Sequence, residues 1–320
     1  MFFLYGSEDS GARNYFSKLF KSYFVESKQF INESDLFSLE EDFLRRNKIK
    51  PTLLTGSALG SDTLDKKAIL LARKWKLKCF SIIEHWSWYR KRFESRNQLI
   101  IPNKIFVNDI IAKKAAISDG LPDEKLIVLG NPVLEDHAIR SPKFRNLEAN
   151  DIRKKYKLKS DKIIICFVSE SLKKIGEIND SLGFDEFYVF SQLREFFKDN
   201  KYHILIKSHP SDPKNKFGKS NQKFSYIEKL PIEDLAVLAD KIIGMGSMLL
   251  IELSFYRNDI ISYRPNSLIY FIGNLLDITI PANDFNTLKI AMKSKALGLK
   301  KFRNSYIGST KKIINYLEKN

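Results

Sequence analysis

Short apolar runs alternate with longer segments in which apolar residues recur every three or four positions along most of the chain. The short runs predict buried strands, and the longer segments predict amphipathic helices. In the first half we expect strands at residues 2–5, 52–54, 78–83, 104–107 and 126–129. Between and after them, helices are expected at residues 10–24, 37–47, 61–74 and 110–117.

The alternation pauses at residues 135–150, which are polar, include Pro142 and have no clear period. We expect a domain boundary there, giving an acceptor-side domain at 1–140 and a nucleotide-binding domain at 141–320. The second half resumes with strands expected at 162–168, 203–206, 241–243 and 259–262 and helices at 151–156, 184–199, 233–239, 247–256, 286–296 and 304–317. The predicted class is α/β, with two Rossmann-like parallel-sheet domains that face each other across a cleft.

Length and composition fit two folded domains. The chain has 320 residues, of which 43% are hydrophobic and 12% aromatic, so each half is large enough to form its own core. No apolar run approaches the roughly 20 residues of a membrane helix. The apolar residues 1–5 are too short for a signal peptide, and Cys79 and Cys166 lie inside apolar runs. We therefore expect two buried free thiols and a cytoplasmic protein.

The formal net charge of +16 changes the list of partners to consider. Most of the cations are lysines spread along the chain, and no nucleic-acid-binding motif accompanies them. A solvated basic surface is the simplest explanation, and peripheral attraction to an anionic membrane, at its inner face, is the second. Purely electrostatic binding to DNA or RNA is the third, and it would be lost at moderate salt.

Two loops in the second half follow predicted strands and carry residues suited to an anionic ligand. Lys207 and His209, followed by Pro210, come after one strand, and Gly244–Gly246 and Ser247 come after another. In open α/β sheets ligands bind at the carboxyl ends of strands, and glycines allow a close approach of backbone N–H groups. We expect a site for a phosphorylated ligand formed by Ser169, Lys207, His209, Pro210, Gly246, Ser247, Met248 and Glu252.

Three of these residues also have an ordinary structural explanation. His209 is held at a rigid corner by the following proline, but it could be a loop residue without function. Ser247 can cap the helix that follows it. Glu252 lies among apolar neighbours and could accept hydrogen bonds from a ribose diol, or it could lie on the surface of its helix.

In the first half, an acidic loop, Glu8 and Asp9, follows the first predicted strand. The two carboxylates argue against an anion there and favour proton acceptance, although capping of the next helix by Asp9 is an equal alternative. The segment 84–93 follows a third strand and combines an acid, a histidine, aromatic residues and cations. This combination suits the binding of a sugar ring. The aromatic residues could equally hold the loop against the sheet. We expect acceptor or sugar binding by Ser57, Glu84, Trp86, Tyr89 and Arg92.

Three segments carry a resemblance to known enzymes. They are Gly130-Asn131-Pro132, the corner from Ile206 to Pro210, and the stretch from Gly244 to Glu252. Together they resemble the two-Rossmann-domain glycosyltransferases called GT-B, in particular bacterial enzymes that build capsule, lipopolysaccharide or teichoic-acid polymers. The His-Pro pair with a downstream serine is similar to sialyltransferases and polysialyltransferases and to transferases that use CDP-glycerol or Kdo donors.

The resemblance implies a metal-independent glycosyltransferase without a cofactor, which uses a nucleotide-sugar donor, CMP- or UDP-linked, and a glycan or lipid-linked acceptor. It implies that His209 and Ser247 hold the phosphate and that Glu252 holds the ribose. It implies a base in the acidic loop, Glu8 or Asp9, with Glu84 or His85 as the next candidates. Some sialyltransferases have an acid-acid-Gly motif, whereas here Ser10 separates the acids from the glycine.

Two other functions fit the same residues. A nucleotide-sugar 2-epimerase or hydrolase would use the same nucleotide half but would convert the donor without an acceptor. A non-catalytic nucleotide- or sugar-binding protein would bind these ligands without turnover.

Overall fold

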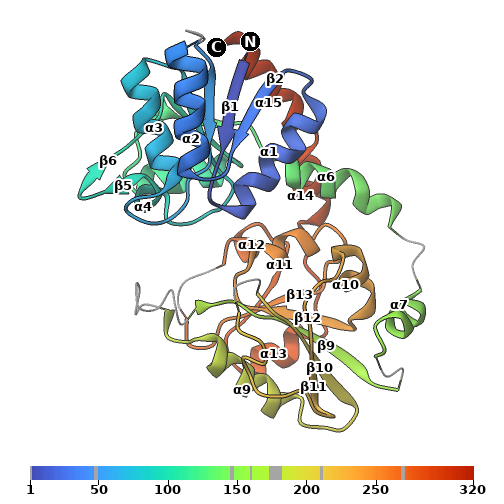
Figure 1. Cartoon of the computed structure of the whole chain (residues 1–320). Helices are drawn as coiled ribbons and strands as arrows, with labels where there is room; N and C mark the ends of the chain where they lie inside the picture. Colours follow the sequence, from blue (N-terminus) through green and yellow to red (C-terminus); the bar gives the residue numbers. More distant parts are fainter. Residues whose placement is uncertain are drawn as a thin grey trace. The chain divides into compact units, whose positions relative to one another are not determined.

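A computed structural model describes residues 2–46, 50–144, 148–158, 161–172, 182–209, 212–267 and 271–320 of the chain (Figure 1). The chain forms two compact units, Met1–Asp136 with Ser305–Asn320, and His137–Asn304. The domains expected from the sequence, 1–140 and 141–320, differ from these units at the end of the chain, because the last helix packs in the core of the first unit.

The first unit contains a six-stranded sheet in which every pair of neighbours is parallel. Its strand order is β2-β1-β3-β4-β7-β8. The strands are β1 (Phe2–Gly6), β2 (Glu26–Phe30), β3 (Thr52–Thr55), β4 (Cys79–Ile83), β7 (Lys104–Val107) and β8 (Leu126–Val128). Since parallel strands need crossover connections, the helices between them cover both faces of the sheet.

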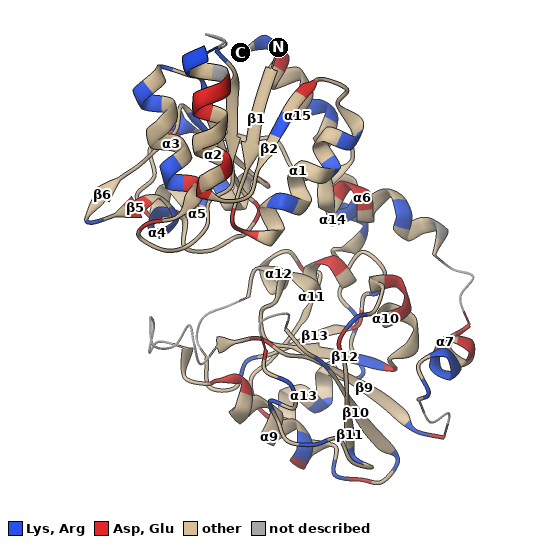
Figure 2. Cartoon of the chain, viewed as in Figure 1, with Lys and Arg blue, Asp and Glu red and all other residues tan. Residues whose placement is uncertain are grey.

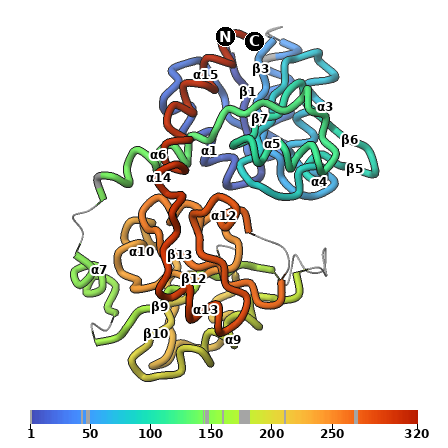
Figure 3. Tube along the Cα trace, turned by 180° about the vertical axis from the view of Figure 1, so that it is seen from behind, coloured from blue at the N-terminus to red at the C-terminus, as the bar shows by residue number. Residues whose placement is uncertain are grey.

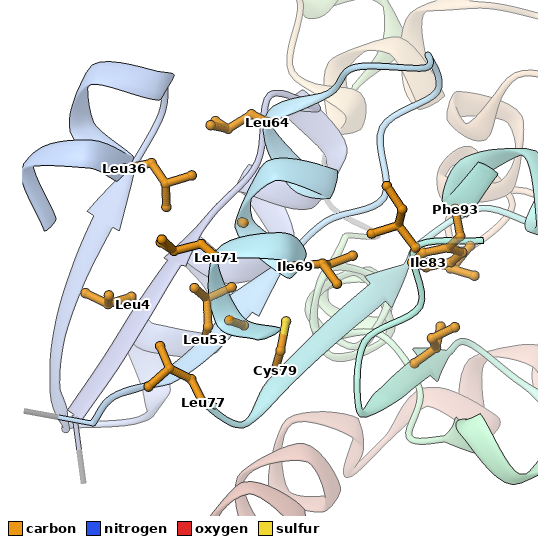
Figure 4. Packing of buried hydrophobic residues seen from close by; sticks show 14 of the residues in the cluster. Leu4, Leu36, Leu53, Leu64, Ile69, Leu71, Leu77, Cys79, Ile83 and Phe93 are labelled. Carbon is orange, nitrogen blue, oxygen red and sulfur yellow. The ribbon is translucent and has the colours of Figure 1, made fainter. Parts of the chain in front are cut away.

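Adjacent residues along these strands point to opposite faces and build two cores. Leu4 and Leu53 belong to one buried cluster, whereas their neighbours Phe3 and Leu54 belong to the other. The first cluster, shown in Figure 4, includes residues of α2 (Glu33–Leu39), α3 (Leu64–Trp75), α4 (Tyr89–Phe93) and α5 (Ile110–Ser118). The second includes residues of α1 (Ser10–Ser22), α6 (Pro132–Arg140) and α15 (Ser309–Lys319).

Helix α15 returns to the first unit from the far end of the sequence (Figure 3). Ile313 and Leu317 are buried against the sheet, and the ring of Tyr316 packs edge-on against Phe80 and Phe106 at centroid distances of 5.9 Å and 5.4 Å. This helix therefore completes one face of a sheet whose strands all come from the first 130 residues.

The second unit has another six-stranded parallel sheet, of order β11-β10-β9-β12-β13-β14. Val189, Phe190 and Leu193 pack on one face, against Ile165 and Phe167 of the sheet. The strands are β9 (Ile163–Val168), β10 (Tyr202–Lys207), β11 (Phe224–Ile227), β12 (Lys241–Gly244), β13 (Ile260–Tyr263) and β14 (Ile280–Ala282). The helices are α7 (Ala149–Lys155), α9 (Glu186–Phe196), α10 (Ile232–Leu238), α11 (Met248–Leu253), α12 (Ile272–Leu275), α13 (Phe285–Ala291) and α14 (Leu299–Tyr306).

The expected α/β class with two parallel sheets is confirmed, and several elements differ from the prediction. Strands β2, β11 and β14 and the hairpin of β5 (Glu94–Ser95) and β6 (Gln98–Leu99) were not expected. The polar segment 135–150 begins inside α6 instead of in an irregular linker. The single helix expected at 304–317 is two helices, separated by Gly308 with φ 85° in the left-handed region.

Lys and Arg occur on helices and loops of both units, interleaved with Asp and Glu (Figure 2). Cys79 and Cys166 are free and buried, as expected. Among the described residues, no helix combines the length and the apolar character needed to cross a membrane.

Candidate functional site

Three neighbouring strands of the first unit end beside one another and bring the predicted catalytic loops together. Strand β3 lies between β1 and β4, so the loops that begin at Ser7, Gly56 and Glu84 leave the same edge of the sheet. A Cβ atom at Gly56 would lie 2.3 Å from Ser7 Oγ, so the close contact between the first two loops requires glycine.

At this edge lies a cluster of Asp9, Glu84 and His85, which we call the Glu84 cluster. His85 Nε2 lies 3.4 Å from Glu84 Oε1, and one ligand-type atom from each of the three side chains lies within 4.8 Å of the others. Glu84 is only 5% exposed, and neither of its carboxyl oxygens has a hydrogen-bond partner among the described residues. The sequence named Glu8 and Asp9 as first candidates for the base and Glu84 or His85 as the next, and the fold brings Asp9, Glu84 and His85 together.

Burial shifts the pKa values of Glu84 and His85 in opposite directions. Desolvation, reinforced by the charge of Asp9, raises the pKa of Glu84 to about 8. Desolvation and the nearby Arg92 cation lower the pKa of His85 to about 4. At neutral pH the cluster therefore holds a protonated carboxyl group beside an uncharged imidazole, which is an arrangement suited to proton transfer.

Other buried polar atoms around this edge also lack partners among the described residues. They are Tyr15 Oη, Ser57 Oγ, Asp65 Oδ2, Ser81 Oγ and Tyr89 Oη. Buried polar groups are normally hydrogen-bonded, so a concentration of unpaired ones is expected where a polar ligand or water binds. The Glu84 cluster also has the donor types that a divalent cation uses, and the metal-free chemistry expected from the sequence stays a prediction.

The acidic loop that the sequence favoured as the base has structural contacts. The backbone N–H of Leu64 donates to Glu8 Oε2 at 3.1 Å, and Glu8 is otherwise exposed. Asp9 caps α1, with the N–H of Gly11 donating to its Oδ1 at 2.7 Å. The capping alternative is therefore correct for Asp9, although its carboxylate also lies in the Glu84 cluster.

The residues expected to bind the acceptor are mostly engaged inside the first unit. Arg92 is 4% exposed and donates to the backbone carbonyls of Ser57 and Ser87 at 2.9 Å and 3.0 Å. The indole of Trp86 donates to Asp109 Oδ2 at 2.7 Å, and Tyr89 is buried in the core. The structure therefore places Arg92, Trp86 and Tyr89 in positions that hold the loop against the sheet.

The second unit repeats the arrangement at the carboxyl edge of its own sheet. Strand β9 lies between β10 and β12, so Ser169 and Glu170 lie between the His209 turn and the Gly244–Ser247 turn. The predicted phosphate-binding loops therefore leave the same edge of the sheet, and their role in binding stays a prediction. Pro210 lies outside the described residues.

The glycine turn after β12 contacts a carboxylate of the chain itself. The backbone N–H of Gly246 donates to Glu170 Oε1 at 2.6 Å. Burial raises the pKa of Glu170, while the backbone N–H groups of Gly246, Met245 and Ser247 and the Arg264 cation oppose that rise. The donors expected to meet a ligand phosphate thus already face an anionic group.

Asp212, which the sequence reasoning missed, organises the turn that carries His209. Its carboxylate accepts hydrogen bonds from the hydroxyls of Ser169 (3.0 Å) and Ser171 (2.8 Å), from the backbone N–H of His209 (3.0 Å) and from Lys216 Nζ (2.7 Å). The Ser169 hydroxyl is therefore engaged inside the protein, and the His209 side chain is exposed.

Four more of the expected binding residues have mixed surroundings. Lys207 Nζ donates to the carbonyls of Ser208 and Glu228 at 3.2 Å and 2.8 Å. Ser247 caps α11, since the N–H of Leu249 donates to its Oγ at 3.2 Å, and Met248 opens this helix half-buried. Glu252 is 27% exposed with Oε2 3.8 Å from His137 Nε2, and burial raises its pKa to about 7.

Sequence reasoning missed four residues near these edges: Asp65, Asp212, Arg264 and His137. Asp65 is 1% exposed and accepts from Thr55 Oγ1 at 2.9 Å, and it lies inside a segment that reads as an ordinary helix. The acidic residue two positions after the His-Pro pair was the one available signal for Asp212.

No protein-family model matches the chain, and no curated protein matches it. Solved structures match over its full length. The UDP-GlcNAc 2-epimerase of Methanocaldococcus jannaschii in complex with UDP-GlcNAc and UDP has a TM-score of 0.65 and 15% identity, covering 100% of this chain and 99% of that one. A glycotransferase of kitacinnamycin has a TM-score of 0.57 and 11% identity, covering 99% and 98%. The wall teichoic acid polymerase TagF has a TM-score of 0.51 and 10% identity, covering 99% and 88%.

These likenesses show that the chain has a GT-B-like fold, as the sequence predicted. At 10–15% identity they show the fold alone.

Proposed function

We propose that this chain is a glycosyltransferase that moves a sugar from a nucleotide-activated donor to a hydroxyl group of a glycan or lipid-linked acceptor in cell-surface polysaccharide synthesis. The second unit holds the nucleotide, and the first unit supplies the base. The observation that carries the proposal is the Glu84 cluster. It has a buried carboxyl group without a hydrogen-bond partner among the described residues, next to a neutral imidazole at the edge where GT-B-like sheets carry their functional loops.

In this mechanism ionised Glu84 takes the proton from the acceptor hydroxyl, and His85 orients the carboxyl group. The acceptor oxygen forms a bond to the anomeric carbon as the bond from that carbon to the donor phosphate breaks, and the electron pair leaves with the nucleotide. A base with a pKa near 8 holds a hydroxyl proton more strongly than an ordinary carboxylate does, yet it is partly ionised at neutral pH.

The second unit would stabilise the leaving nucleotide with fixed donors. His209 is an exposed imidazole at the strand edge, and Ser247 lies at the glycine turn two strands away in the sheet. Donors aimed at a phosphate whose negative charge grows lower the barrier to its departure. Glu252, partly exposed on α11, is our candidate for the ribose hydroxyls.

A nucleotide-sugar 2-epimerase is the second candidate, favoured by the match of a UDP-GlcNAc 2-epimerase structure to the full chain. Incubating the protein with CMP-, CDP-, UDP- and GDP-linked sugars, with and without glycan acceptors, separates the two activities. We expect donor consumption only when an acceptor is present. Conversion of a donor alone to its C2 epimer, followed by NMR, would contradict the transferase and support the epimerase.

His209→Ala is expected to lower turnover by about a hundredfold, because one fixed donor to the leaving phosphate is lost. The unfolding transition should not move, since the side chain is exposed. His203→Ala is the matched control, because His203 lies at the other end of the same strand and bonds Ser225 Oγ at 2.8 Å. Equal rates for the wild type and His209→Ala would remove His209 from the site.

A further inference from the structure

The turn between β12 and α11 binds an anionic group that belongs to the chain. Glu170 Oε1 accepts the N–H of Gly246 at 2.6 Å, and the N–H groups of Met245 and Ser247 face the same carboxylate. Three successive backbone donors that face one anion form a concave site of the type that binds phosphate oxygens in other proteins. Here the anion is a side chain from the end of the neighbouring strand β9.

A guanidinium cation lies beside this carboxylate. The Arg264 guanidinium lies near Glu170, donates to the Met245 carbonyl at 3.3 Å and stacks over the ring of Phe184 at 5.3 Å. A Cβ atom at Gly246 would lie 2.9 Å from Arg264 Nη1, so the absence of a side chain at Gly246 makes room for the guanidinium beside the turn. Among the described residues, Arg264 is the cation whose charge acts on the Glu170 carboxyl group, and the two opposite charges offset each other.

We propose that Glu170 determines donor specificity, by occupying the anion-binding turn so that the site accepts a nucleotide with one phosphate and rejects a nucleoside diphosphate. The inference rests on the proposed function. The phosphate of a donor such as a CMP-linked sugar would be held by the side chains of His209 and Ser247, and not by the Gly246 N–H that Glu170 occupies. The extra phosphate of a CDP- or UDP-linked donor would lie against the Glu170 carboxylate, and like charges placed together disfavour binding.

Isothermal titration with CMP, CDP, UMP and UDP tests the proposal, because each pair differs by one phosphate. The wild type should bind the monophosphate of a pair at least as tightly as the diphosphate. Glu170→Gln should raise the affinity for the diphosphate over that for the monophosphate by roughly tenfold. Glu195→Gln, which removes an equal charge from an exposed pair with Lys198, should leave the ratio unchanged.

Arg264→Gln provides a second variant that works even where Glu170→Gln fails to fold, and it should shift the ratio further toward the monophosphate. The proposal is overturned if the wild type binds diphosphates about ten times more tightly than monophosphates. It is also overturned if the Glu170 and Arg264 variants both keep the wild-type ratio of diphosphate to monophosphate affinity. Binding of none of the four nucleotides by wild type or variants would overturn the proposed function together with this inference. An unchanged ratio with tight binding would overturn the inference alone.

Discussion

Glu84→Gln is expected to abolish turnover and at the same time to make the protein more stable at alkaline pH. The substitution keeps the shape of the side chain but removes the proton acceptor. Loss of a general base costs about a hundredfold to ten-thousandfold in rate. The same change removes the cost of ionising a carboxyl group that is 5% exposed and has no hydrogen-bond partner among the described residues.

The sign of the stability effect follows from the raised pKa. Glu84 is protonated in both states below the pKa of the unfolded chain, near 4.3, so Glu and Gln should differ little there. As the pH rises toward the folded-state pKa of about 8, the unfolded chain loses the proton first, and the wild type becomes progressively less stable. At pH 9, urea unfolding should give the variant a free energy of unfolding higher than that of the wild type by a few kcal/mol, on the order given by the difference in pKa. At pH 4 the two free energies should be nearly equal.

The proposed role of Glu84 as the base also predicts how the turnover rate depends on pH. The rate of the wild type should rise with pH and level off above about 8, where Glu84 is ionised. Glu8→Gln is the matched control, because Glu8 is exposed and its carboxylate accepts the backbone N–H of Leu64, a contact that glutamine can keep. An active Glu84→Gln enzyme would show that Glu84 is not the base. A stability difference from the wild type that does not change with pH would show that Glu84 is not a buried acid with a raised pKa.

Asp212→Ala is expected to have the largest effect on stability, a loss of about 3–5 kcal/mol, and to abolish nucleotide binding. The Asp212 side chain is 1% exposed and ties Lys216, two serine hydroxyls and the His209 backbone into one network. Alanine removes the acceptor that these donors share, although Lys216 keeps a second carboxylate partner, Glu186. It also releases the turn that presents His209. Urea denaturation measures the first effect, and titration with nucleotides at a temperature where the variant is folded measures the second.

A double-mutant cycle separates this network from general damage. Lys216 contacts both Asp212 and Glu186 at 2.7 Å, so Lys216→Met should also be strongly destabilising, and the double variant should be far less so than the sum of the two. Burial raises the pKa of Asp212, but Lys216, Ser171, the His209 backbone and Ser169 together hold it below its usual value. Its contribution should therefore be lost as the pH falls below about 4. Additive effects of the two substitutions would contradict a coupled network.

The sequence pattern predicted the central strands well because they are buried on both faces. Strand β7 has the predicted bounds of residues 104–107, and in β9 every residue after Ile163 is buried. Strand β2 was missed because it is an edge strand whose sequence, ESKQF, buries only Phe30. Strand β14 was missed because it is three residues long and contains Pro281, which a strand tolerates at an edge.

The sequence predicted which residues lie together at the candidate site better than it predicted the role of each residue. Counting strand ends was sufficient to bring Asp9, Ser57 and His85 to one edge, because parallel strands place their carboxyl ends together. The pattern gave no measure of which carboxylate is buried, so Glu8 was preferred to Glu84. It also could not show that Glu170 folds back onto the glycine turn, because that contact joins residues 76 positions apart.

The return of α15 to the first unit has a consequence for the order of events during synthesis. Ile313 and Leu317 fill the sheet face that carries Phe80 and Phe106, so the ribosome must make the second unit before the first can close its core. A nascent chain that ends near residue 136 would expose this hydrophobic face of the sheet to chaperones and to other unfinished chains. The later-made half should consequently be the first to reach its native state.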